Sequence, residues 1–424
     1  MSDEGNGEQR EDSARPVQPS GWRLINIERL KNPPTAVAAF VYVAATLFGL
    51  AVLVLVAFGL FAAFQIAYET AVGKFTDRIE AAKVFFPILL ALVGGPLLIW
   101  RVITAHIQAQ ATRHQAETGR EAHYTTLFTK AVEQLGATRE VKETIEIDDA
   151  RGVINREVIT KTEPNLEVRL GAIYALDRIT RDSERDHWPI MQVLCAYVRN
   201  PQNCGAPAPP PEGIEPGSRK FHDWVESIRP PRVDIQAALA VIGERAEGRR
   251  ELEASRSLQL DLRHTNLQRA VLNKSYFERA TFEGAHLDGA SFIQAHLDNA
   301  WFIEAHLDGA SFDGAHLDDA CFTGAHLGGA SFHKAHLGGS FFKGTHLDGA
   351  SFNEAHLDGA SFFNVDLSKA LRLEPVLLAS AFGDASTRLP EGMEWPAAWP
   401  VRELSEDERD AWREAPRDPR PGKT

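Results

Sequence analysis

Eight histidines recur every ten residues in the C-terminal half of this 424-residue chain, and each stands directly before a leucine. An aspartate follows that leucine in six of the eight places. Imidazole and carboxylate groups are common ligands of zinc and similar divalent cations, so one interpretation of the pattern is metal binding. The histidines are His286, His296, His306, His316, His326, His336, His346 and His356.

The other interpretation is a ladder of solvated histidines, fixed by duplication of a repeat. If twenty residues make one coil, alternate histidines of the series lie on one face and the remaining four on the opposite face, about 4.8 Å apart. The even spacing favours duplication over a single site, and no closed set of four ligands can be recognised in it. The sequence therefore predicts no metal site and no cofactor, and metal binding by the ladder stays a third hypothesis of function.

Motifs of common enzyme classes are absent from the sequence. It contains no H-E-x-x-H, no P-loop, no G-x-S-x-G and no Rossmann glycine pattern. A Ser/His/Asp triad or a carboxylate pair assembled from distant positions would leave no such motif. His187, in the segment DSERDHW, is interpreted as structural. We therefore expect a protein that is not an enzyme and has no catalytic residues.

The histidines belong to a stretch with a period of five, residues 261–370. The second residue of each pentad is Leu or Phe in all 22 pentads, and the residue two places before it is Ala, Ser or Thr in 20 of them. A helix would repeat its apolar residues every three or four positions and a strand every two, so this period indicates a solenoid. Leu and Phe alternate from residue 281 onward, which makes the true repeat ten and predicts a four-sided coil of two tens.

Stacked coils place Phe on Phe and Leu on Leu, which predicts a dry core with Ala at the inner corners. The predicted core residues are Phe282, Phe292, Phe302, Phe312, Phe322, Phe332, Phe342, Phe352, Phe362, Leu287, Leu297, Leu307, Leu317, Leu327, Leu337, Leu347 and Leu357. The pattern resembles the pentapeptide-repeat family, A-(D/N)-L-x-x, which implies a right-handed quadrilateral β-helix over 259–370. His or Ser often replaces the family's Asp or Asn before the central residue, a position that should still face outward.

Two apolar stretches near the N-terminus predict a transmembrane hairpin. Residues 35–68 and 84–100 contain no charged side chain, and we place two spans at about 35–67 and 84–104 within a region 34–105. Residues 1–33 precede them as an acidic, disordered tail and a short juxtamembrane helix. Basic residues flank the pair on its terminal side more often than in the joining loop, so both termini are expected in the cytoplasm. This predicts a multi-pass protein of a bacterial inner membrane.

Composition agrees with a cytoplasmic body. The formal net charge is −13, whereas nucleic-acid binders are more often basic, so nucleic acid is not the expected partner. The three cysteines form no C-x-x-C, which suits a reducing compartment.

Residues 106–258 are expected to be mainly α-helical, with a β-hairpin at 140–161 and a loop or flexible linker at 206–218, which contains five prolines. Apolar residues at helical spacing predict helices at 166–180, 188–200 and 234–245, the first of them similar to a HEAT-repeat helix. The order of these segments also resembles the region that precedes the repeats in bacterial membrane-anchored pentapeptide-repeat proteins. Residues 371–424 break the pentad and should cap the open strand edges, through a segment resembling the tail motif GDASTRLP…WP, before a disordered tail of about twenty residues.

Our leading hypothesis is a membrane-tethered, non-enzymatic scaffold or interaction protein that presents the rod to a cytoplasmic partner. The predicted partners are the lipid bilayer and a protein whose identity the sequence does not give, and the oligomeric state is left open. The alternative comes from family members whose acidic rods imitate DNA to regulate or protect type II topoisomerases. The rod has 14 Asp and Glu against 7 Lys and Arg, a modest excess for a duplex mimic.

Overall fold

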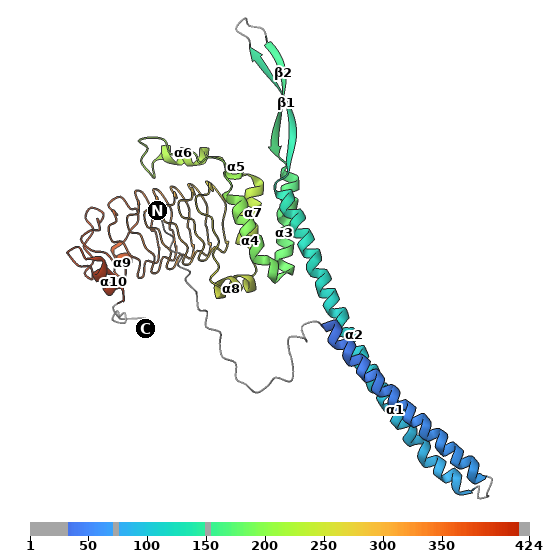
Figure 1. Cartoon of the computed structure of the whole chain (residues 1–424). Coiled ribbons are helices and arrows are strands. Elements are labelled where there is room, and N and C mark those ends of the chain that lie inside the picture. The colour runs from blue at the N-terminus through green and yellow to red at the C-terminus, as the bar shows by residue number, and fades with distance from the viewer. Residues whose placement is uncertain (1–32, 71–75, 149–153, 415–424) are drawn as a thin grey trace, which may run out of the picture. The chain divides into compact units, whose positions relative to one another are not determined.

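A computed structural model describes residues 33–70, 76–148 and 154–414 of the chain (Figure 1). These residues belong to two compact units, Met1–Thr118 and Gly119–Thr424, which are described separately. The predicted N-terminal tail and juxtamembrane helix, at 1–32, lie outside the described residues.

The first unit contains helix α1 (Pro33–Thr70) and most of helix α2 (Thr76–Leu135). Within the described residues, one segment is long and apolar enough to cross a membrane: Leu47–Ile66 in α1, with a mean hydropathy of 2.7 and none of it buried. The predicted second span lies in α2, where the side chains before residue 94 are outside the described set. The two-span hairpin therefore stays a prediction. Helix α2 ends at Leu135, where Gly136 follows and donates its N–H to the carbonyl of Glu133.

The second unit begins with an antiparallel hairpin of β1 (Thr138–Asp148) and β2 (Ile154–Pro164), paired in register from Thr138↔Pro164 to Asp148↔Ile154. β-Branched and charged residues make up most of both strands, and β-branched residues favour an extended, pleated backbone. Lys161 and Glu143 form an ion pair across the hairpin.

A small helical bundle follows the hairpin, built from α3 (Leu166–Asp182), α4 (Glu184–Arg199) and α7 (Val233–Gly243). Asn165 and Ser183 cap the first two helices by accepting backbone N–H bonds through their side chains. The apolar faces meet in a core whose central side chains are fully buried: Ile173, Leu176, Leu194, Ile235 and Leu239. Three short helices were not predicted, α5 (Pro201–Cys204), α6 (Arg219–Ser227) and α8 (Glu247–Ser255).

The repeats form a rod of stacked four-sided coils. The first residue of each pentad makes a parallel β-bridge to the residue twenty positions further on, from Asp261↔Thr281 to Ser351↔Leu371. The bridges fall into four columns, and we number the faces by these first residues. Face 1 carries Thr281, Trp301, Cys321, Phe341 and Ser361; face 2 carries His286, His306, His326 and His346; face 3 carries Ser291, Ser311, Ser331 and Ser351; face 4 carries Tyr276, His296, His316, His336 and His356.

Each corner of the coil is a tight turn. The N–H of Ala270 donates to the carbonyl of Leu267 at 2.9 Å, and Arg269, between them, has a φ of +56°. A positive φ at this third turn position is the signature of a type II β-turn, which favours glycine. The same turn recurs along the rod with glycine or with a longer side chain, such as Glu304 at +54°.

The interior of the rod is filled with side chains. All the predicted core Phe and Leu residues are between 0 and 2% exposed. Rings one coil apart stack in parallel, as Phe302 and Phe322 do at 5.1 Å between centroids and 5° between planes. Rings from opposite sides of the coil meet edge to face across the core, as Phe312 and Phe322 do at 5.9 Å and 83°. Both geometries are favoured by aromatic pairs and add to the stabilisation from burial.

Both ends of the rod are covered. At the first coil, the side-chain amide of Gln236 in α7 accepts from the N–H of Val271 at 3.1 Å and donates to its carbonyl at 2.6 Å, as a preceding strand would. At the other end, strand pairing continues past residue 370, since Ser361 bridges Phe382 and Asp366 bridges Arg388.

The cap at the far end is held by a buried carboxylate. Asp384 is fully buried and accepts from the N–H of Leu404 at 2.9 Å and from Arg409 Nε at 3.0 Å. Arg409 lies in α10 (Glu406–Glu414), whose Trp412 ring packs against Phe382 at 4.9 Å. The short α9 (Pro375–Leu378) precedes this cap. The prediction of disorder over the last twenty residues is therefore wrong for 405–414, because Trp412 and Arg409 give this charged helix an apolar and ionic anchor.

Candidate interaction faces of the rod

The eight predicted histidines form two stacked columns on opposite faces. On face 2 the ring centroids are 4.5, 4.9 and 4.6 Å apart, and on face 4 they are 4.8, 4.8 and 4.7 Å apart. Tyr276 extends the face 4 column, 4.6 Å above His296. All eight side chains face outward and are at least partly exposed. The columns are thus continuous ribbons of aromatic rings along the outside of the rod.

This stacking does not suit metal binding. The lone pair of an imidazole nitrogen lies in the ring plane, so parallel rings aim their lone pairs side by side rather than at one shared point. Zinc needs nitrogen ligands converging at about 2.0–2.1 Å. Among the described residues, no group of three or more His, Cys, Asp and Glu side chains could hold a metal ion.

Burial keeps several of these histidines neutral. The pKa values of His286, His326 and His336 are lowered, first by partial burial of the ring and next by neighbouring histidines of the same column. A charged ring would be repelled by the rings above and below it. His286, His326 and His336 therefore resist protonation within their columns.

Two columns of aspartates run beside the histidines, two residues further along each strand. On face 4, one oxygen of Asp298 accepts the N–H of Asp318 at 3.0 Å, and one oxygen of Asp318 accepts the N–H of Gly338 at 2.8 Å. On face 2, Asp308 accepts the N–H of Gly328 at 2.7 Å. Burial, followed by repulsion from Asp288, raises the pKa of Asp308 to about 6. Burial is also the first cause that raises the pKa of Asp298.

The two histidine faces differ in what covers them. Residues 206–228, which we call the strap, run along the rod beside face 2 and include α6 (Figure 1). Four glycines, one per coil, make room for the strap: Gly289, Gly309, Gly329 and Gly349. A methyl group on Gly309 would lie 3.1 Å from Val225 and 3.2 Å from Phe221, and one on Gly349 would lie 2.9 Å from the Pro216 carbonyl.

Polar contacts fix the strap at both ends. The side-chain amide of Gln268 accepts from the N–H of Ala208 at 2.8 Å, donates to its carbonyl at 2.9 Å, and donates to Asp288 at 2.7 Å. Arg269 donates to the carbonyl of Ile228 at 2.9 Å, at the end of α6. Phe221, Trp224 and Ile228 form a buried cluster of their own against the rod. Of the two states predicted for 206–218, a loop or a flexible linker, the structure therefore has the loop, which packs on the coils.

The strap was not predicted, although two signals for it are present in the sequence. Glycine occupies the fourth pentad position once in every twenty residues on this side, a period that marks one column of the coil. Phe221, Trp224 and Val225 lie three and four residues apart, after the helix cap Ser218, which is typical of a short amphipathic helix.

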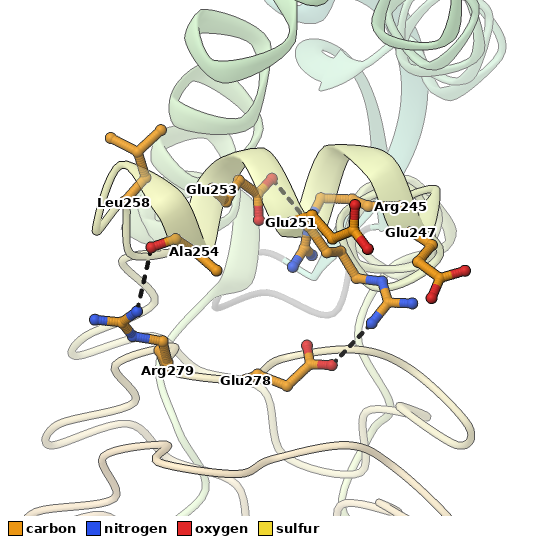
Figure 2. Close-up of a pocket in the computed structure, with 9 residues that line it drawn as sticks. Arg245, Glu247, Glu251, Glu253, Ala254, Leu258, Glu278 and Arg279 are labelled. Carbon is orange, nitrogen blue, oxygen red and sulfur yellow. Dashed lines mark hydrogen bonds and ion pairs between the residues drawn. The ribbon is translucent and has the colours of Figure 1, made fainter.

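A cavity of about 250 Å³ opens beside α8 and is lined by charged residues (Figure 2). Two of its three arginines are ion-paired: Arg245 with Glu253 at 3.0 Å, and Arg250 with Glu278 at 3.0 Å. His187, 1% exposed, has its Nε2 2.6 Å from an oxygen of the same Glu253. These contacts hold α8 to the bundle and the first coils, in keeping with the structural role expected of His187.

Comparisons with known proteins match the same repeats. Residues 275–352 fit the family model described as a pentapeptide repeat region, and no curated protein matches the chain. One similar solved structure is QnrB1, a plasmid-mediated fluoroquinolone resistance protein, at 17% identity, a TM-score of 0.27, and coverage of 36% of this chain and 74% of that one.

Two further solved structures are similar. A pentapeptide repeat protein from the Arabidopsis thaliana thylakoid lumen is 27% identical, with a TM-score of 0.18 and coverage of 27% of this chain and 74% of that one. Rfr23 from the cyanobacterium Cyanothece is 17% identical, with a TM-score of 0.18 and coverage of 34% and 99%. The family match falls within the coils that the parallel bridges define, so this part of the chain, residues 275–352, is a pentapeptide repeat region.

Proposed function

We propose that the chain is a membrane-tethered, non-enzymatic scaffold that presents its rod to a protein partner. The interior of the rod is filled by fully buried, stacked rings, so a partner can meet only the outer faces. On faces 2 and 4 the side chains repeat at 4.5–4.9 Å along a backbone bonded coil to coil. This stiff, regular arrangement of outward side chains is the observation that carries the proposal.

The tether in this proposal is the predicted pair of spans, with both termini in the cytoplasm. The apolar segment Leu47–Ile66, with none of it buried, supports the first span. The uncharged run at 84–100 supports the second, within a helix long enough to extend beyond a bilayer. Reporter fusions in the 69–83 loop and at the C-terminus test this topology: the loop reporter should be exported and the C-terminal one retained. An exported C-terminus would contradict it.

The DNA-mimic alternative has less support in the placement of the acidic residues. Asp288 is 2% exposed and bonded to Gln268, so part of the acidic column beside face 2 is hidden. The first residue of most strands on faces 2 and 4 is a histidine, which adds no negative charge. A gyrase supercoiling assay with the full-length chain separates the hypotheses, since inhibition or drug protection at sub-micromolar protein would favour the mimic.

Photo-crosslinking in native membranes tests the scaffold itself. A photoreactive amino acid replaces His316 or His336 on face 4, or Tyr174 of α3 as a control that is 60% exposed but lies off the rod. The proposal expects a discrete crosslinked partner from the rod positions and not from Tyr174. Failure of both rod positions to crosslink any partner, or the same partner from all three positions, would contradict presentation by the rod.

A further inference from the structure

Within the described part of the second unit, face 4 is the uncovered counterpart of face 2. Both faces carry a histidine column at the first pentad position and an aspartate column at the third. Beside face 2 the strap buries Asp288 and Gly328, whereas on face 4 Asp318 is exposed. The same pair of columns is therefore partly covered on one side of the rod and exposed on the other.

The open face is complementary to itself. First and third residues of a strand point to the same side, about 6.6 Å apart, so each row offers a histidine on its left and an aspartate on its right. A two-fold axis parallel to the rod would exchange left and right. It would place each histidine of one copy opposite an aspartate of the other in the rows of His296, His316 and His356. Two copies share the same rise per coil, so the rows stay in register.

Like side chains stacked in one column repel one another when they are charged. A column of the opposite kind on a second copy would reduce this repulsion. Burial lowers the pKa of His336 first, and repulsion by neighbouring histidines lowers it next; burial raises the pKa of Asp298, the N–H of Asp318 lowers it, and repulsion by the Asp318 carboxylate acts in the raising direction. An aspartate facing the histidines, and a histidine facing the aspartates, would reverse both effects.

We propose that face 4 is a self-association surface, on which a second copy of this chain docks in parallel and pairs its aspartate column with the histidine column of the first. Such an interface is isologous, as most dimer interfaces are. The face is narrow and polar, so the dimer is weak, with a dissociation constant in the micromolar range. The first row does not take part, because Arg250 already covers Tyr276 at 3.6 Å and pairs with Glu278.

Mass measurements on the full-length chain in detergent test the proposal. Sedimentation equilibrium should show a concentration-dependent dimer, and Asp298→Asn with Asp318→Asn should weaken it at least about tenfold by removing two charge-assisted pairs per copy. Asp308→Asn, the matched change beside the strap on face 2, should change it less than about twofold. A parent that stays monomeric, or equal losses in the two variants, would overturn the proposal.

Disulfide trapping tests the parallel arrangement, with Cys204 and Cys321 replaced by serine. A mixture of His296→Cys chains and Asp298→Cys chains should crosslink between copies, while His296→Cys chains alone should not. Crosslinking of the His296→Cys chains alone, as fast as in the mixture, would place histidine opposite histidine and overturn the pairing. Unchanged thermal unfolding of each variant confirms that the loss of crosslinking is not a loss of fold.

Discussion

Gly329 of the rod lies against Gly217 of the strap so closely that a methyl group added to Gly329 would stand 3.0 Å from the Gly217 nitrogen. The approach is backbone to backbone, so no side chain can move aside to make room. It shows that the strap is fitted to this column of the rod.

Gly329→Ala should therefore displace the strap, and Gly344→Ala is its matched control. The two glycines have φ values of +67° and +69°, but nothing lies within 4 Å of a methyl group on Gly344. Both changes should cost about 1 kcal/mol for a residue with a side chain at positive φ. Gly329→Ala should cost about 1–3 kcal/mol more from overpacking, and should speed proteolysis within 206–218. Equal stability and equal proteolysis in the two variants would contradict this fit.

Phe322→Ala should destabilise the rod by about 3–5 kcal/mol, because it leaves a cavity between rings that are themselves locked by stacking. Cys321→Ser, one residue away and facing outward, should change the free energy of unfolding by no more than about 0.5 kcal/mol. Chemical denaturation of the two variants measures both values. A silent Phe322→Ala would mean that the pentad phase is wrong.

The orientation of each pentad residue could be predicted from the sequence because every side of the coil is built in the same way. One residue points into the core, its neighbours point outward, and a turn follows. Leu or Phe at the second position of every pentad, as at Leu317 and Phe322, left one arrangement that buries them all. The strap was not predictable in the same way, because its apolar side chains are few and its partner is a column of glycines. Phe221 and Trp224 pack where glycines twenty residues apart leave room on the rod. A pattern within a short stretch of sequence does not show this spacing. The helix at 406–414 was missed because a charged segment is anchored by only two residues, Arg409 and Trp412.

Replacing His306 and His326 with serine should leave stability near pH 7.5 almost unchanged and improve it in acid. The pKa of His326 is lowered in the folded rod, by burial and then by its neighbours, so the unfolded chain binds protons more readily. The folded state therefore loses stability as the pH falls below about 6.5. Thermal unfolding near pH 7.5 and pH 5 measures this, with His114→Ser on exposed α2 as the control. Equal acid sensitivity of the ladder variant and the parent would contradict it.

Asp308→Asn should stabilise the protein above about pH 6. The pKa of Asp308 is raised to about 6 by burial and by Asp288, so the charged carboxylate destabilises the fold at neutral pH and the neutral form does not. Asparagine keeps an oxygen to accept the N–H of Gly328. The expected gain is about 1–3 kcal/mol near pH 8, and it vanishes below about pH 3, where both states bind the proton. A gain that is independent of pH would exclude the carboxylate charge as its cause.

The composition of all four faces depends on which pentad residue faces solvent. Cys321 is the first residue of its pentad, so its reactivity shows directly whether that position is exposed. Cys321 is partly exposed beside a cavity of about 330 Å³, whereas Cys195 is 3% exposed and burial raises its pKa to about 12. In a Cys204→Ser chain, a small polar thiol reagent should modify Cys321 in the folded protein and Cys195 only after unfolding. Mass spectrometry of the labelled peptides would show one modified thiol, at Cys321. A folded chain in which Cys321 stays unmodified until unfolding would place the first pentad residue inside and contradict the faces described for this rod.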